Sequence, residues 1–269
     1  MLIWVAALHC EAKPVIDYYR LRKSAADRAF DVYRGDEIAC IVSGTGKLAS
    51  ASACAWIAAA CAQHPALAWF NLGTAGAAEH EIGSAFHLNK IVDADSGERY
   101  YPVTTAAAGF PGSECLTLGQ PSFDYREDCL FDMEASGFMH AALCFSSAEL
   151  IRSVKVISDN RRRQCGNNRQ QVSDLVHGHI EQIAGEAEGL AELARAQARL
   201  EAPPESWRQL LELAHFSETQ KNRLRVLWRY LNNRDFDSGQ LLRSLPAQAS
   251  AGSIIEALEK ISHRDSENL

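Results

Sequence analysis

Three acidic residues in this sequence each come directly after an apolar run that is typical of a buried strand. They are Glu11, Glu134 and Asp159, and the runs before them span residues 2–8, 129–133 and 154–157. An ionised carboxylate beside such a run is costly unless something binds it. Neighbouring acids can exchange protons with a substrate or stabilise positive charge on it. Taken singly, Glu134 is equally explained as a solvated strand end or a helix-capping acid. Asp159 alone is better explained as a helix N-cap, and Glu11 alone is explained by the helix dipole.

The elements that must position these acids alternate between strand-like and helix-like runs. The strand-like runs are residues 2–8, 37–44, 67–72, 87–92, 115–119, 129–133 and 154–157, and the helix-like runs are 47–62, 135–144 and 172–200. Most strand-like runs are largely apolar and do not alternate between apolar and polar residues, which indicates strands covered on both faces, as in a largely parallel sheet. Their order therefore favours a doubly wound or related three-layer α/β fold.

Small or acidic residues follow five of the predicted strands. They are Glu11, Gly44-Thr45-Gly46, residues 71–76, Asp132 with Glu134, and Ser158 with Asp159. Ligands of such sheets bind outside the carboxyl ends of the strands, so this placement predicts a pocket along one sheet edge. The glycines beside Thr45 do not form a Walker A loop, because the leading glycine and the hydroxyl residue after Lys47 are missing.

In this order, the motifs resemble the purine nucleoside phosphorylase/uridine phosphorylase superfamily, and they look closest to the methylthioadenosine/S-adenosylhomocysteine nucleosidases. The resemblance covers roughly residues 1–200. It implies a three-layer α/β/α sandwich with a mixed, mostly parallel central sheet, and hydrolysis of the N-glycosidic bond of an adenosine-type nucleoside. It also implies a homodimer that works without a cofactor.

The resemblance implies a role for each acid. Glu134 would hold the ribose hydroxyls, with Met133 packed on the sugar. Asp159 would protonate, or hydrogen-bond to, the imidazole-ring nitrogen of the purine, and Ser158 would orient it.

The remaining residues of the implied site surround the nucleophile and the base. Glu11 would polarise the attacking water, and Thr74 stands where the family has a serine near that water. Ala75 and Gly76 would let the backbone approach the substrate closely. Phe123 is the candidate for the aromatic ring that stacks on the purine.

Water is favoured over phosphate as the nucleophile, because residues 68–71 lack the arginine that the superfamily's phosphorylases commonly place there. Lys155 stands where the nucleosidases usually carry arginine, and Arg161, Arg162 and Arg163 follow Asp159. Lys155 is therefore a candidate substrate-binding residue, and a phosphate-dependent phosphorylase remains the alternative.

An alternative of a different class is a nucleoside-binding or interaction protein without catalysis. It is suggested by the short stretch at residues 101–130 and by the helical extension that we predict over residues 201–269. The extension contains two patterns of the capping-box type, at residues 217–220 and 253–256.

The composition argues against several other classes of function. A net charge of -7 weakens the case for a nucleic-acid partner, and no apolar stretch is long enough to indicate a membrane partner. The eight cysteines form no CxxC pair, which favours free thiols in a reducing cytoplasm. No cluster with metal-ligand spacing is found, so we expect neither a metal nor a cofactor.

Overall fold

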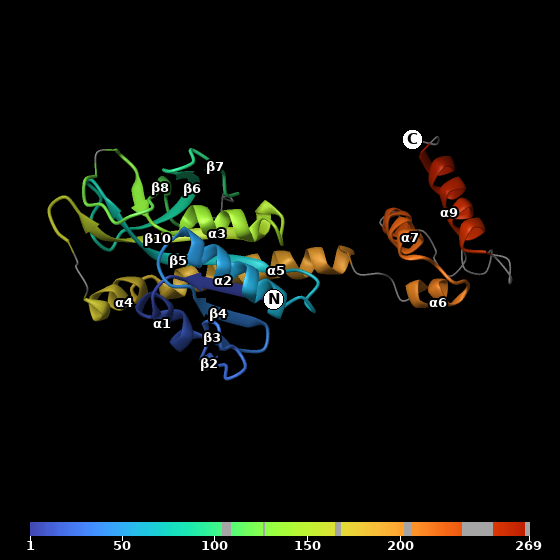
Figure 1. Cartoon of the computed structure of the whole chain (residues 1–269), viewed down its shortest axis with the longest axis horizontal. Helices are drawn as coiled ribbons and strands as arrows, with labels where there is room; N and C mark the ends of the chain where they lie inside the picture. The colour runs from blue at the N-terminus through green and yellow to red at the C-terminus, as the bar shows by residue number, and fades with distance from the viewer. Residues whose placement is uncertain (104–108, 126, 165–167, 202–205, 233–249, 267–269) are drawn as a thin grey trace. The chain divides into compact units, whose positions relative to one another are not determined.

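The computed structural model of the chain describes residues 1–103, 109–125, 127–164, 168–201, 206–232 and 250–266. The chain divides into an α/β unit, Met1–Ala196, and a helical unit, Gln197–Leu269 (Figure 1). The last helix of the α/β unit, α5 (Ile180–Glu201), runs through this division and through the boundary that we predicted at residue 200.

A single mixed sheet forms the centre of the α/β unit. Its strands are β1 (Leu2–Ala6), β2 (Arg22–Lys23), β3 (Asp31–Arg34), β4 (Ile38–Val42), β5 (Ala68–Ala77), β6 (Ala85–Asp93), β7 (Arg99–Tyr100), β8 (Gly112–Thr117), β9 (Leu130–Asp132) and β10 (Ile151–Asn160). Strand β1 pairs in parallel with β4 and β5, and β5 pairs in parallel with β10. The sheet order is β10-β6-β8-β9-β5-β1-β4-β3-β2, and the further pairing of β10 with β5 closes part of the sheet on itself.

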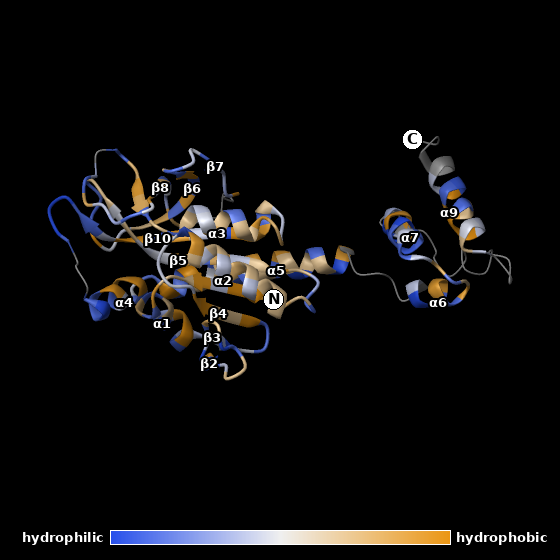
Figure 2. Cartoon of the chain, viewed as in Figure 1, coloured by the Kyte–Doolittle hydropathy of each residue, from blue (hydrophilic) through white to orange (hydrophobic). Residues whose placement is uncertain are grey.

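Helices cover both faces of this sheet, which confirms the predicted α/β sandwich. Helices α2 (Lys47–Ala60) and α3 (Ala135–Ala142) pack on the face that carries Ile3 and Val5. The opposite face, with Leu2, Trp4 and Ala6, packs on α1 (His9–Tyr18), α4 (Arg169–His177) and α5. Successive side chains of a strand point to opposite faces, so both sides of β1 are apolar. Figure 2 shows the hydrophobic colouring gathered on these central strands.

Strands β5 and β10 extend well beyond the runs that predicted them. Residues 71–76 do not form a turn after the strand, because β5 continues to Ala77 along β10 and pairs with β9 at its end. The polar residues Asn71 and Thr74 thus lie on a strand that pairs with β10, and the Thr74 amide donates to the carboxylate of Glu11. Pairing with β10 and β9, which are distant in the chain, extends β5 beyond the apolar run that predicted it.

Helices α2 and α3 contact each other through Gly137. A Cβ atom at this position would collide with the backbone carbonyl of Lys47. We therefore expect Gly137→Ala to lower the free energy of unfolding by about 1–3 kcal/mol, as overpacking does. Gly185→Ala in α5 is the matched control, because a Cβ atom there meets nothing within 4 Å. Urea unfolding measures both variants, and equal stability of Gly137→Ala and wild type would contradict the close approach.

The helical unit has its own apolar core. Helices α6 (Ser206–Glu212), α7 (Glu218–Asn232) and α9 (Ala251–Ser266) contribute its buried residues, which include Trp207, Leu210, Leu224, Trp228, Ile254 and Leu258. The first predicted capping box is confirmed, because Ser217 Oγ accepts from the Gln220 amide and Gln220 Oε1 from the Ser217 amide. The second prediction is wrong, because α9 begins before residue 253 and Ser250 Oγ accepts from the Ser253 amide.

Across the described ranges, no helix combines the length and the apolar character that a membrane span requires.

Candidate active site

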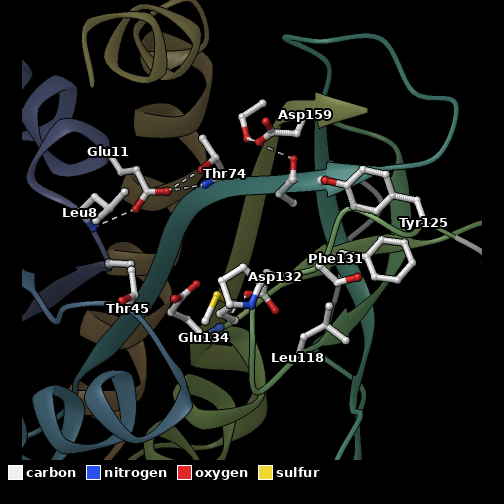
Figure 3. Close-up of a pocket in the computed structure, with 17 residues that line it drawn as sticks. Leu8, Glu11, Thr45, Thr74, Leu118, Tyr125, Phe131, Asp132, Glu134 and Asp159 are labelled. Atoms are coloured by element: carbon white, nitrogen blue, oxygen red, sulfur yellow. Dashed lines mark hydrogen bonds between the residues drawn. The ribbon is translucent and has the colours of Figure 1, made fainter. Parts of the chain in front are cut away.

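One cavity of about 190 Å³ receives side chains from five of the predicted strand ends. We call it the carboxylate pocket; it is lined by Ala7, Leu8, Glu11, Thr45, Thr74, Ala75, Gly76, Leu118, Pro121, Ser122, Tyr125, Phe131, Asp132, Met133, Glu134, Ser158 and Asp159. Figure 3 shows Leu8 and Glu11 at one end of the pocket and Tyr125 with Asp159 at the other. Acids that are more than a hundred residues apart in the chain thus converge on one space.

Glu11 is held firmly in the first turn of α1. Its Oε2 accepts a hydrogen bond from the Leu8 amide at 2.9 Å. Its Oε1 accepts from the Thr74 amide at 2.7 Å and from the Thr74 hydroxyl at 2.8 Å. The side chain is buried, and a Cβ atom at Gly73 would stand only 3.2 Å from Oε1. Glycine at this position lets the carboxylate lie directly on strand β5.

Glu134 precedes helix α3 and faces the loop before α2. Its Oε1 accepts a hydrogen bond from the Gly46 amide at 2.8 Å. Burial raises the pKa of Glu134 to about 7; the nearby Lys155 ammonium opposes this shift and Asp132 adds to it. Near neutral pH this carboxyl group therefore changes charge, which lets it act either as an acceptor or as a donor.

Asp132 and Lys155 form a buried ion pair beneath the pocket, with 2.9 Å between Oδ2 and Nζ. Burial favours a higher pKa for Asp132, but the Lys155 ammonium and the hydroxyl of Thr117 outweigh it and hold the pKa below its usual value. Burial likewise favours a lower pKa for Lys155, and the charges of Asp132, Glu134 and Glu11 reverse that and raise it.

These contacts correct the expected role of Lys155. It is fully buried and does not line the pocket; its ammonium instead pairs with Asp132 beneath the other carboxylates. The sequence placed it on a strand near the site but could not show which way its ammonium points.

Asp159 enters the pocket from an irregularity in β10. The pairing with β5 shifts between Ile157 and Asp159, so Ser158 is the extra residue of a bulge. The bulge turns both Ser158 and Asp159 towards the pocket. The Ser158 hydroxyl donates to Asp159 Oδ2 at 2.5 Å, which fixes the orientation of that carboxyl group.

The aromatic wall of the pocket differs from the prediction. Phe123 is 54% exposed and does not line the pocket, so it is not the stacking ring in this structure. Tyr125 and Phe131 line it instead, with ring centroids 5.1 Å apart. Burial, with the nearby charge of Asp159, raises the pKa of Tyr125 to about 12. Residues 119–124 form no helix or strand, so no periodicity could show which aromatic residue faces inward.

The charged side chains that line the pocket are all acidic among the described residues. Four carboxylate residues line it, and none of the described lining residues is lysine or arginine. Arg161 and Arg162 do not line it and instead pair with Glu79. Such a site suits a substrate that develops positive charge, and it opposes an entering anion.

No group of three or more metal-ligating side chains with suitable geometry occurs in the described ranges. The four acids that line the carboxylate pocket can accept protons, donate them and stabilise a developing cation.

Comparison with known proteins identifies the fold. No protein-family model matches the sequence, and no curated protein sequence matches it. Among solved structures, Arabidopsis thaliana 5'-methylthioadenosine nucleosidase aligns with a TM-score of 0.59 and 15% identity, over 71% of this chain and 97% of that chain. The 5'-methylthioadenosine/S-adenosylhomocysteine nucleosidase from Neisseria meningitidis gives 0.56 and 14%, over 69% and 98%. Futalosine hydrolase of Helicobacter pylori gives 0.54 and 11%, over 70% and 97%.

These similarities show that the chain contains the nucleosidase fold, nearly complete. Almost the whole length of each neighbour aligns with about seven tenths of this chain. The described part of residues 101–130 supplies Leu118, Pro121, Ser122 and Tyr125 to the pocket.

Proposed function

We propose that this protein is a purine nucleosidase, which hydrolyses the N-glycosidic bond of an adenosine-type nucleoside. The observation that carries the proposal is the convergence of Glu11, Glu134 and Asp159 on one cavity. The nucleosidase fold supports it, because the solved structures with that fold include enzymes named for this reaction. Water is the nucleophile in this proposal, because the described lining offers no cation to hold phosphate.

In this proposal each of the three acids has its own part in the chemistry. Asp159, oriented by Ser158, would donate a proton or hydrogen bond to the purine and make it a better leaving group. Glu134 would accept hydrogen bonds from the ribose hydroxyls, beside Met133. Glu11 would activate the water, and Thr74 holds Glu11 in place through two hydrogen bonds. The three carboxylates together would stabilise the oxocarbenium-like sugar of the transition state.

The direct test is release of free base by the purified protein. Methylthioadenosine, S-adenosylhomocysteine, adenosine and inosine are each incubated with and without phosphate. We expect base release from at least one adenosine-type nucleoside, at a rate that phosphate does not change. Release that strictly requires phosphate would assign a phosphorylase, and binding measured by thermal shift without any release would assign a non-catalytic binding protein.

The raised pKa of Glu134 predicts a pH dependence. Ionised Glu134 accepts hydrogen bonds from hydroxyl groups, and the ionised form predominates only above its pKa of about 7. We therefore expect kcat/KM to rise from about pH 6 to about pH 8, with a limb that Glu134→Gln removes. Glu181→Gln on the exposed side of α5 is the matched control and keeps the wild-type profile. A limb that survives in Glu134→Gln would assign it to another group.

The assembly and location of the protein are part of the same proposal. A homodimer would bury large apolar side chains that stand exposed in the single chain, among them Leu48, which is 85% exposed at the start of α2. Light scattering measures the mass in solution. The seven described cysteines are all unpaired, which supports a cytoplasmic location; Cys165 lies outside the described residues.

A further inference from the structure

A second hollow adjoins the carboxylate pocket and shares one residue with it. We call it the cationic pocket; it is lined by Leu8, His9, Cys10, Lys13, Arg169, Gln170 and Ser173. Leu8 lines both pockets and is 40% exposed. The cationic pocket is the larger of the two, with a volume of about 340 Å³ against 190 Å³. It lies between the first turns of α1 and α4, whose residues Cys10 and Val172 pack together.

The two pockets have opposite charge. Lys13 and Arg169 line the cationic pocket, and its described lining includes no acidic residue. Lys13 forms an ion pair with Asp17 on the next turn of α1, with 2.5 Å between Nζ and Oδ2. Among the described residues, no carboxylate forms an ion pair with Arg169, which is exposed. It stands in the first turn of α4, where no acidic residue accompanies it and the helix dipole adds positive potential. An arginine that is exposed and unpaired beside a cavity is available to bind an anion.

The proposed function fixes how a nucleoside would lie between the pockets. Asp159 and Tyr125 mark the base end of the carboxylate pocket, and Leu8 marks the opposite end (Figure 3). With the base beside Asp159 and the ribose hydroxyls on Glu134, the C5′ substituent is the part of the nucleoside that is left to pass Leu8. The cationic pocket lies directly beyond that residue.

We propose, on the basis of this proposed function, that the substrate is a nucleoside with an anionic C5′ substituent, a carboxylate or a phosphate, held by Arg169 and Lys13. The carboxylate pocket and the net charge of -7 both oppose an anion. These two cations would offset that repulsion and keep the anionic group away from Glu11 and Glu134. Charge would then select the substrate, since a neutral C5′ group gains nothing from Arg169.

The test compares nucleosides that differ only at C5′. Adenosine, methylthioadenosine, adenosine-5′-carboxylic acid and adenosine 5′-phosphate are assayed for adenine release, and the two anionic compounds show whether carboxylate or phosphate fits. We expect one of them to have at least about a tenfold higher kcat/KM than adenosine. Arg169→Gln should lower kcat/KM for that anionic nucleoside by about 10- to 100-fold, as expected for loss of a charge-assisted hydrogen bond. Arg195→Gln, which removes a partly exposed arginine of α5, is the matched control and keeps the preference.

Calorimetry separates this inference from the proposed function. Adenosine and the two anionic nucleosides are titrated into the wild type and into Arg169→Gln. Tighter binding of an anionic nucleoside that depends on Arg169 supports the cationic pocket even if no base is released, which would contradict the proposed function alone. Hydrolysis of neutral nucleosides with no gain in binding or kcat/KM from an anionic C5′ group would overturn the cationic pocket and leave the proposed function standing.

Discussion

Replacing Asp159 with asparagine will lower the rate of adenine release by about 10²–10⁴-fold, the usual contribution of general acid-base catalysis. Asparagine keeps the size of the side chain, and its amide can still accept the hydrogen bond from the Ser158 hydroxyl. It cannot supply a carboxyl proton to the departing purine. The loss should therefore appear in kcat for a nucleoside substrate, with the melting temperature close to that of the wild type.

The design of this experiment separates chemistry from folding. Asp174→Asn, on the exposed side of α4 and outside both pockets, removes the same charge and should retain full activity. Single-turnover measurements of adenine release report the chemical step itself. Turnover of Asp159→Asn at the wild-type rate would remove Asp159 from the role of acid and would direct attention to another donor near the base, with Tyr125 the adjacent candidate.

Replacing Lys155 with methionine will lower the free energy of unfolding of the α/β unit by about 3–5 kcal/mol, because it leaves buried charge uncompensated. Lys155 lies 2.9 Å from Asp132, and both side chains are almost completely inaccessible to solvent. Glu134 and Glu11 also depend on this ammonium for compensation of their charge. Urea unfolding followed by circular dichroism measures the loss, and hydrogen exchange of the amides of β5 and β10 localises it.

A double-mutant cycle tests the physical cause of that loss. Asp132→Asn removes the partner charge. Its single amide oxygen can still accept from the Ala135 amide, and its NH2 group would then face the Thr117 hydroxyl as a donor. The double variant, Lys155→Met with Asp132→Asn, should recover part of the stability that Lys155→Met loses. If Lys155→Met does not fold, Lys155→Arg and Asp132→Asn still measure the coupling. Strictly additive effects would contradict an energetic link between these two residues.

The position of Asp159 on a bulge shows how the fold can set the direction of an acidic side chain. Regular pairing would place successive side chains of β10 on opposite faces of the sheet. The extra residue at Ser158 brings two consecutive polar side chains to one pocket, with the hydroxyl fixed on the carboxylate. Deleting Ser158 would remove the bulge and change the direction of the Asp159 side chain. Ser158 therefore belongs to the proposed site as a positioning residue.

The sequence by itself determined the layers of the fold and the acids of the proposed site. Residues 2–8 are apolar at every position, and residues 154–157 are apolar apart from Lys155, which is typical of strands covered on both faces. Once parallel strands are predicted, their carboxyl ends must meet at one edge, so the sequence alone places Glu11 and Asp159 together. Local pattern and one topological rule were sufficient for this part.

The tertiary structure alone decided which neighbours these acids meet. Three features depend on residues distant in the chain. They are the pairing of β5 with β10, the ion pair between Lys155 and Asp132, and the position of Tyr125, but not Phe123, in the lining of the pocket. The same is true of the cationic pocket, which needs α1 and α4 side by side. Side-chain direction and charge compensation are properties of three-dimensional packing, and a one-dimensional pattern records the residue types without recording what they face.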